Sequence, residues 1–234
     1  MVSKSIAQSF IRKILAWYAR AARDLPWRKT RDPYRVAVSE FMLQQTQVSR
    51  VLEYYPRFLK RFPTLEKLAR AKPKAVREAW EGLGYYARAA NLHALARVVR
   101  EANGGVIPET PDELQKLPGV GAYTAGAIAS FAYERPAAAV DTNVGRVLGR
   151  VFYRQPKTVN QRRLWELASK LVPKDGKRAW RFNQAVMELG ALVCIARKPR
   201  CSVCPVQSVC KYAATASPSL RSAPQSRAHQ RAMR

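Results

Sequence analysis

The chain has 234 residues, which is enough for one large domain or two small ones. Hydrophobic residues make up 47% of it, so a buried core can form. Lysine and arginine number 42 against 16 aspartate and glutamate, which gives a formal net charge of +26. This excess favours a polyanionic partner, nucleic acid first, although it does not separate DNA from RNA or an enzyme from a scaffold. No apolar run approaches the roughly 20 residues of a membrane span, so we expect no membrane partner.

Residues 1–23 contain several basic side chains and no acidic one, since the first acid is Asp24. That composition is also typical of a mitochondrial transit peptide. Phe10, Ile14, Trp17 and Tyr18, however, fall on one face at helical spacing. This pattern favours a structural helix over a targeting segment.

The rest of the chain has the periodicity of helices and no long alternating run typical of strands. Val48, Val51 and Tyr55 recur at spacings of three and four, and residues 36–48 form a further helical segment. A capping box, Thr-Pro-Asp-Glu at 110–113, predicts the start of a helix. The sequence therefore predicts an all-α fold.

The cysteines fall in one short stretch with the spacing C-x6-C-x2-C-x5-C. Two disulfides are an alternative, but no secretory signal accompanies them. Four thiolates suit either zinc or a [4Fe–4S] cluster, and this spacing matches neither of the common ligand patterns. Either metal would close a basic loop that is suited to contact phosphate. The predicted ligands are Cys194, Cys201, Cys204 and Cys210.

Leu-Pro-Gly-Val-Gly at 117–121 follows one predicted helix and precedes another. Gly119 and Gly121 let the backbone turn tightly and approach a ligand closely. Amides at the N-terminus of the next helix would then face an anion such as a DNA phosphate. An ordinary corner between helices is the alternative. A dinucleotide site is disfavoured because no strand precedes the glycines.

The Leu-Pro-Gly-Val-Gly motif, an aspartate about twenty residues later and the cysteine spacing together resemble the endonuclease III superfamily. Other segments resemble its MutY-type adenine glycosylases, in the expected order from about residue 15 to residue 210. These segments are Leu-Pro-Trp-Arg at 25–28, Asp-Pro-Tyr at 32–34, Ser-Glu-Phe-Met-Leu-Gln-Gln-Thr-Gln-Val at 39–48, Trp-Glu-Gly-Leu-Gly-Tyr-Tyr-Ala-Arg-Ala at 80–89, Asn-Gln-Ala at 183–185 and Met-Glu-Leu-Gly-Ala at 187–191.

The resemblance implies that the four cysteines hold a [4Fe–4S] cluster and not zinc. It also implies a two-lobed helix-hairpin-helix glycosylase fold with a cleft between the lobes. We expect a six-helix barrel lobe with the hairpin over residues 24–133. The cluster lobe is expected to combine residues 1–23 with residues 134–212.

Cleavage of a purine N-glycosidic bond needs a proton for the leaving base and an anion beside the cationic sugar. Glu40 lies in an apolar segment, where burial would raise its pKa and keep it protonated, although an exposed or ion-paired Glu40 is the alternative. The resemblance identifies Glu40 as the acid that protonates the adenine ring nitrogen. It identifies Asp141 as the carboxylate that stabilises the oxocarbenium ion, next to the site residue Asn143. Asp141 is also a candidate N-cap, and Thr142 stands where the family usually has glycine.

Tyr123 occupies the position at which strand-cleaving relatives carry a lysine nucleophile. Tyrosine cannot form the Schiff base, so the resemblance implies a monofunctional enzyme whose Tyr123 touches the flipped nucleotide. Packing in the core is the alternative for this ring.

Other residues are assigned to DNA by the resemblance. Some wedge into the duplex and contact the base opposite the flipped one. A thymine-specific branch carries basic residues at positions 44 and 45, so glutamine at both positions favours adenine. The predicted DNA-binding residues are Arg28, Gln44, Gln45, Thr46, Leu83, Tyr85, Gly119 and Gly121.

The sequence thus predicts a monofunctional DNA glycosylase that removes adenine paired with 8-oxoguanine or guanine. We expect it to be a monomer, to bind double-stranded DNA with mispaired adenine, and to act in the cytoplasm at a bacterial nucleoid. Two alternatives stay open: a thymine or uracil mismatch glycosylase of the same fold, and a catalytically silent, cluster-bearing DNA-binding module.

The segment after Cys210 is rich in Ser, Ala, Pro and Arg. Such a composition predicts a disordered basic tail over 213–234. Typical adenine glycosylases carry a C-terminal domain there that recognises 8-oxoguanine. We therefore expect weaker discrimination between 8-oxoguanine and guanine than in two-domain relatives.

Overall fold

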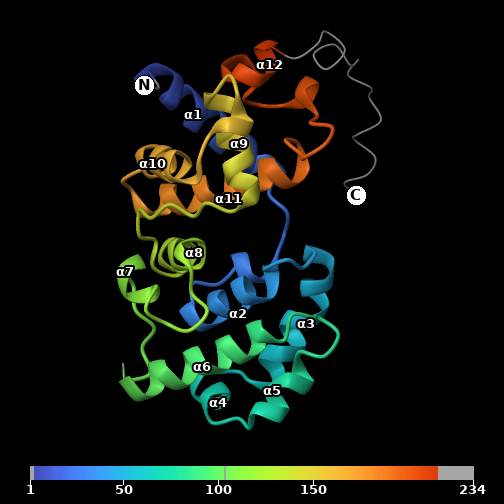
Figure 1. Cartoon of the computed structure of the whole chain (residues 1–234), viewed down its shortest axis with the longest axis vertical. Helices are drawn as coiled ribbons and strands as arrows, with labels where there is room; N and C mark the ends of the chain where they lie inside the picture. Colours follow the sequence, from blue (N-terminus) through green and yellow to red (C-terminus); the bar gives the residue numbers. More distant parts are fainter. Residues whose placement is uncertain (1–2, 103, 216–234) are drawn as a thin grey trace. The chain divides into compact units, whose positions relative to one another are not determined.

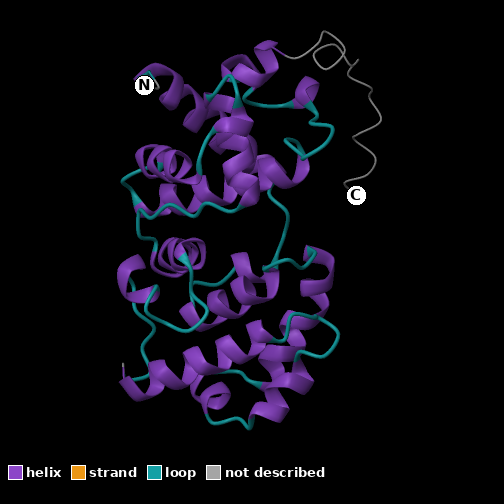
Figure 2. Ribbon diagram, viewed as in Figure 1, coloured by secondary structure: helices purple, strands orange, loops and turns teal. Residues whose placement is uncertain are grey.

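The computed structural model describes residues 3–102 and 104–215. Within these ranges the regular elements are all helices, which confirms the predicted all-α fold (Figure 2). None of the described helices is long and apolar enough to cross a membrane. The chain divides into two compact units. Unit 1 comprises Met1–Ala22, Val140–Val172 and Arg181–Arg234, and unit 2 comprises Arg23–Ala139 and Pro173–Trp180.

Unit 2 contains η1 (Pro26–Arg28), α2 (Pro33–Leu43), α3 (Val48–Arg61), α4 (Leu65–Ala69), α5 (Pro73–Ala79), α6 (Ala87–Ala102), α7 (Pro111–Leu114) and α8 (Ala122–Tyr133). Helix α2 packs on α8, and α6 packs on α4 and α5 (Figure 1). The rings of Phe58 and Trp80 meet edge to face in the core, with centroids 5.7 Å apart. Residues 36–42 of α2 are all buried, so α2 is a central helix of this unit.

Unit 1 contains α1 (Lys4–Ala21), α9 (Thr142–Phe152), η2 (Pro156–Thr158), α10 (Gln161–Leu171), most of α11 (Gly176–Leu192), η3 (Cys201–Val203), η4 (Gln207–Val209) and α12 (Lys211–Thr215). Phe10 of α1 contacts Phe152 and Phe182, with centroid distances of 5.1 and 6.2 Å. Phe10, Ile14 and Tyr18 are buried. The predicted structural helix near the N-terminus is therefore confirmed.

Helix α2 begins and ends for identifiable reasons. The Asp32 carboxylate accepts hydrogen bonds from the backbone amides of Tyr34 (2.8 Å) and Arg35 (3.2 Å), and proline occupies the first helical position. The prediction that one helical segment covers 36–48 was wrong, because α2 ends at Leu43. Gln45 has a φ of 55°, which a right-handed helix does not allow. Residues 44–47 are therefore a loop between two helices.

Helix α12 also departs from the prediction, since it continues through Thr215 and buries Ala213. The prediction that the disordered tail starts at 213 was therefore wrong for its first three residues. The remainder of that predicted tail, 216–234, lies outside the described residues.

Candidate active site and cluster segment

Glu40 and Tyr123 come together where α2 packs on α8. Glu40 is only 4% exposed, so the alternative of an exposed carboxylate is excluded. The Tyr123 hydroxyl donates a hydrogen bond to Glu40 Oε2 at 2.8 Å. Tyr123 is thus more than a packing ring, because it fixes the orientation of the carboxyl group.

The loop after α2 is tied to α8 as well. Gln44 Nε2 donates to the buried hydroxyl of Thr124 at 3.4 Å, while Gln45 points into solvent. Tyr85, in a second loop between α5 and α6, is 63% exposed with a φ of 47°. Leu83 of the same loop is only 7% exposed, so contact with DNA would require this side chain to move.

The hairpin lies between α7 and α8. Gly119 has a φ of +73°, and a side chain at this position would start 2.6 Å from Asn91 Cβ. Gly121 is the N-cap of α8, and no side chain caps the first amides of that helix. The helix dipole at this end of α8 favours an anion.

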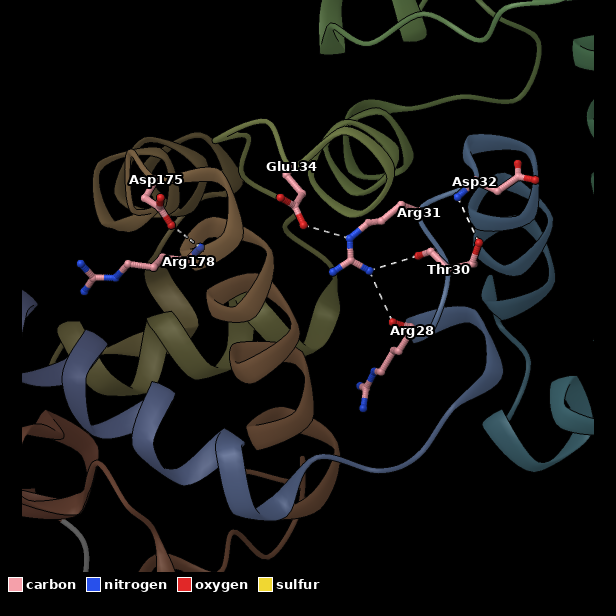
Figure 3. A network of polar contacts seen from close by, with 7 residues as sticks. All are labelled: Arg28, Thr30, Arg31, Asp32, Glu134, Asp175 and Arg178. Carbon is pink, nitrogen blue, oxygen red and sulfur yellow. Dashed lines mark hydrogen bonds and ion pairs between the residues drawn. The ribbon is translucent and has the colours of Figure 1, made fainter.

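Arg28 is the last residue of η1, and Arg31 holds the loop that follows it in place (Figure 3). Arg31 donates to Glu134 Oε1 at 3.1 Å and to the backbone oxygens of Arg28 and Thr30 at 3.5 and 3.1 Å. Its guanidinium lies 4.3 Å from the centroid of the Trp180 ring. Arg28 itself donates from Nη1 to the Arg23 carbonyl at 3.1 Å.

In unit 1, Asp141 caps α9. Its Oδ1 accepts from the Val144 amide at 2.7 Å, which confirms the predicted N-cap, and its Oδ2 accepts from Asn143 Nδ2 at 3.0 Å. Thr142 is the first helical residue and does not have a positive φ. The glycine usual in the family is therefore not needed for this backbone conformation.

Arg146 extends the contacts of Asp141 toward the cysteines. Its Nη2 donates to Asn143 Oδ1 at 2.6 Å and to the Gly190 carbonyl at 2.9 Å. Its Nε donates to the Cys194 carbonyl at 2.8 Å. A chain of hydrogen bonds therefore runs from the predicted catalytic carboxylate to the backbone of the first cysteine.

The four cysteines line one cavity of unit 1 together with Val151, Leu189 and Val193. A zinc ion would need its sulfur ligands about 2.3 Å from one point. Among residues 3–102 and 104–215, no three Cys, His, Asp or Glu side chains are placed to share one metal ion. In a [4Fe–4S] cluster each cysteine binds a different iron, so the thiols surround a cavity as they do here. The donor set therefore fits a cluster.

Arg150 packs against this segment. Its Nη1 lies 3.5 Å from Cys194 Sγ and donates to the Ile195 carbonyl at 2.7 Å. Burial raises the pKa of Cys204 to about 12, and it also raises the pKa values of Cys201 and Cys210. Thiols in such surroundings are neutral without metal, and bound metal favours the thiolate form.

The sequence did not indicate the roles of three arginines: Arg146 and Arg150, described above, and Arg88, which donates to the backbone at the end of α2. Arg146 and Arg150 recur at a helical spacing of four after Asp141, which is a signal of one shared face. That face turned out to contact the cysteine segment. Arg88 lies in the family-like segment 80–89, but its contacts with residues 41–46 could not be foreseen, because these partners lie more than forty positions away in the sequence.

Two family models match the chain. Residues 38–174 match the HhH-GPD superfamily of base excision DNA repair proteins. Residues 194–210, which begin and end on cysteine, match the iron–sulfur binding domain of endonuclease III. The cofactor of this chain is therefore a [4Fe–4S] cluster, and the four cysteines are its predicted ligands.

Curated relatives and solved structures agree with these models. The adenine DNA glycosylase of Rattus norvegicus is 49% identical over 215 residues, which cover 87% of this chain and 41% of that protein. The adenine DNA glycosylase of Mycolicibacterium smegmatis is 44% identical over 88% of this chain and 70% of that protein. A thermostable thymine-DNA glycosylase superimposes with a TM-score of 0.84 at 33% identity, covering 91% of this chain and 98% of its own. Endonuclease III, trapped covalently on DNA, shares the fold with a TM-score of 0.78 at 24% identity.

The chain spans about two fifths of the length of the rat relative. The HhH-GPD match covers more than half of the chain, and the mycobacterial relative is matched over more than two thirds of its length. The chain therefore belongs to the HhH-GPD superfamily of base excision DNA repair proteins and, within it, to the adenine DNA glycosylase family.

Proposed function

We propose that this chain is a monofunctional DNA glycosylase that excises adenine mispaired with 8-oxoguanine or guanine. The observation that carries the proposal is the buried Glu40 carboxyl with the Tyr123 hydroxyl 2.8 Å from it, because a lyase would need an amine nucleophile at position 123. Similarity to relatives named adenine DNA glycosylase supports adenine as the base removed.

In this proposal Glu40 gives its proton to a ring nitrogen of adenine, so that the base leaves as a neutral molecule. Asp141 is the anion that stabilises the oxocarbenium ion left on the sugar. Its two oxygens are held by the Val144 amide and by Asn143, which keeps the carboxylate oriented. Water then adds to the sugar, and the products are free adenine and an abasic site.

Double-stranded DNA is the partner, bound by a monomer that acts at the nucleoid. The lobe predicted over 24–133 carries the hairpin for phosphate and the 44–46 and 83–85 loops for the base opposite adenine, while the target nucleotide is flipped out. The lobe predicted from 1–23 and 134–212 carries Asp141 and the cysteines. When bound, the cluster supplies metal-linked folding energy to the basic segment around it.

The second candidate is a thymine mismatch glycosylase, which the similarity to the thermostable thymine-DNA glycosylase favours. Gln44 and Gln45 argue for adenine, since the thymine-specific branch has basic residues at these positions. The two candidates differ in the base that is released, so one assay separates them.

The experiment offers the holoprotein four duplexes: adenine opposite 8-oxoguanine, adenine opposite guanine, thymine opposite guanine and uracil opposite guanine. We expect strand breaks only in the two adenine duplexes and only after alkali. Breaks in the thymine duplex alone would replace the proposal with the second candidate. Breaks without alkali, or a protein–DNA adduct trapped by borohydride, would contradict the monofunctional assignment.

Glu40→Gln tests the acid, because glutamine has nearly the same shape and cannot give up a proton. We expect single-turnover excision to fall by about 10²–10⁴-fold while DNA affinity stays unchanged. The matched control is Glu53→Gln, since Glu53 is an exposed residue of α3. Excision by Glu40→Gln within tenfold of wild type would exclude Glu40 as the acid. No excision by the wild-type protein or by Glu40→Gln would favour the silent DNA-binding module.

A further inference from the structure

Arg88 is a buried arginine at the second position of α6, with only 7% of its surface exposed. Its Nη1 donates to three backbone oxygens at the end of α2 and just beyond it: Phe41 at 3.2 Å, Met42 at 2.7 Å, and Gln44. The same nitrogen lies 2.9 Å from the Thr46 hydroxyl. One side of the guanidinium therefore binds the loop that follows the Glu40 helix.

The other side of the guanidinium binds a second loop. Arg88 Nη2 donates to the carbonyls of Leu83 at 3.2 Å and Gly84 at 3.0 Å. The guanidinium carbon lies 5.5 Å from the ring centroids of both Trp80 and Tyr85. The exposed Tyr85 ring is thus supported by a cation.

This charge is buried without a carboxylate: within the described part of the chain, Arg88 contacts carbonyls, one hydroxyl and two rings. Burying an arginine costs free energy that its interactions must recover. Carbonyls at the C-terminus of α2 carry partial negative charge and lack partners within the helix, so a cation is favourable there. A planar fork of five donors can reach both loops at once, which a lysine ammonium cannot.

Each loop contains one non-glycine residue in a strained backbone conformation. Gln45 and Tyr85 have φ values of 55° and 47°, in the left-handed region that disfavours side chains. Trp80 Nε1 donates to the Gly84 carbonyl at 3.2 Å, and Arg50 Nη2 donates to the Gly82 carbonyl at 3.0 Å. Strained loops held by several outside contacts are typical of functional surfaces.

We infer that Arg88 is a positioning residue that locks the 44–46 and 83–85 loops into one rigid surface, preset to read the base opposite the excised one. The inference deepens the proposed function, because it rests on the assignment of these two loops to DNA. A surface that is already ordered loses less conformational freedom when it binds. The gain in affinity is therefore expected for specific complexes and not for contacts with phosphates.

The test compares Arg88→Lys with wild type in binding to a duplex with adenine opposite 8-oxoguanine and to a fully paired duplex of the same sequence. The variant keeps the positive charge and loses the fork. We expect mispair affinity to fall at least about tenfold, the effect of one lost hydrogen bond to a charged group, while affinity for paired DNA stays within about twofold. Arg97→Lys, an exposed arginine on the same helix, is the matched control and should change neither affinity.

A second readout needs no DNA: amide hydrogen exchange of the free holoprotein. Arg88→Lys should speed exchange in the peptides that cover the two loops and leave α9 and α10 unchanged. If this variant does not fold, Thr46→Val removes a single contact of Arg88 and should act in the same direction more weakly. If Arg88→Lys exchanges faster but the wild-type protein excises no adenine, the positioning role stands and the proposed function is rejected. Unchanged exchange, or equal losses of affinity for mispaired and paired DNA, would overturn the inference.

Discussion

The Glu40 carboxyl and the Tyr123 hydroxyl are separated by 83 positions in the sequence and by 2.8 Å in the structure. Glu40 is neutral in its acid form, and a hydrogen bond between two neutral groups contributes about 0.5–1.5 kcal/mol. The tyrosine therefore adds to the function of Glu40 by holding one of its two oxygens. The ring alone would not do this, because an aromatic edge cannot donate a strong hydrogen bond.

We predict that Tyr123→Phe slows single-turnover excision of adenine by about 2–10-fold, the kinetic equivalent of that hydrogen bond. Stability should change little, since the ring still packs. The matched control is Tyr55→Phe, which removes a hydroxyl that donates to the Arg35 carbonyl at 3.3 Å and leaves the site intact. An excision rate of Tyr123→Phe equal to that of wild type would show that the contact does not position the acid.

The sequence indicated Glu40, Tyr123 and Asp141 as candidates, but not the hydrogen bonds that position them. The three residues lie in motifs that resemble a known family, and a motif specifies residue type and position. The donor to Glu40 is set by helix packing, which brings two distant segments together. Arg88 shows the limit most clearly, because its hydrogen-bond partners at residues 41–46 precede it by more than forty positions.

At the scale of elements, the end of α2 shows how a side chain from another helix can set a helix boundary. Residues 44–47 are Gln-Gln-Thr-Gln, with no glycine or proline to stop a helix. The helix nevertheless ends at Leu43, where Arg88 takes the carbonyls of its last turn. The all-α class and the starts of α7 and α9 were predictable, since local caps determine them, whereas the predicted segment 36–48 missed the start of α2 at Pro33.

Helix α9 links Asp141 to the cysteine segment through Arg146. We predict that Arg146→Met lowers both the iron content and the melting temperature of the purified protein, because it leaves the Gly190 and Cys194 carbonyls and Asn143 Oδ1 without this donor. Each such unpaired group costs about 1–3 kcal/mol when buried. Arg162→Met is the control, since Arg162 makes only an exposed pair with Glu166, which is worth about 0–1 kcal/mol. Iron content and melting temperature both equal to wild type would contradict the prediction.

The hairpin and the helix that follows it contain two glycines with opposite roles. A Cβ on Gly126 would lie 1.9 Å from the Ala138 carbonyl oxygen, whereas a Cβ on Gly121 would meet nothing within 4 Å. We predict that Gly126→Ala lowers the free energy of unfolding by about 1–3 kcal/mol or more. Gly121→Ala should stay near wild-type stability and weaken DNA binding, because its methyl group would face the approaching phosphate. Urea denaturation and duplex affinity separate the two effects, and a stable Gly121→Ala that binds like wild type would remove Gly121 from the interface.

At the scale of the whole molecule, the net charge of +26 predicts a DNA affinity dominated by phosphate contacts. Each phosphate neutralised releases counterions, so the logarithm of the association constant falls linearly with the logarithm of salt concentration. For about 6–10 contacts the slope lies between about −5 and −9. We predict a slope in this range for fully paired duplex DNA, measured by fluorescence anisotropy from low to physiological salt.

Substitutions in the cysteine segment would show whether some of those phosphate contacts lie there. Arg197 and Lys198 are exposed between the first two cysteines, in the loop that the cluster closes. If they bind phosphate, the double substitution Arg197→Gln and Lys198→Gln should reduce the magnitude of the slope by about 2, roughly 0.9 for each lost contact. Lys74→Gln, at an exposed position of α5 outside the predicted interface, should leave the slope unchanged. A double variant with the wild-type slope and full iron content would show that Arg197 and Lys198 do not bind phosphate, because the loss of two phosphate contacts cannot leave counterion release unaltered.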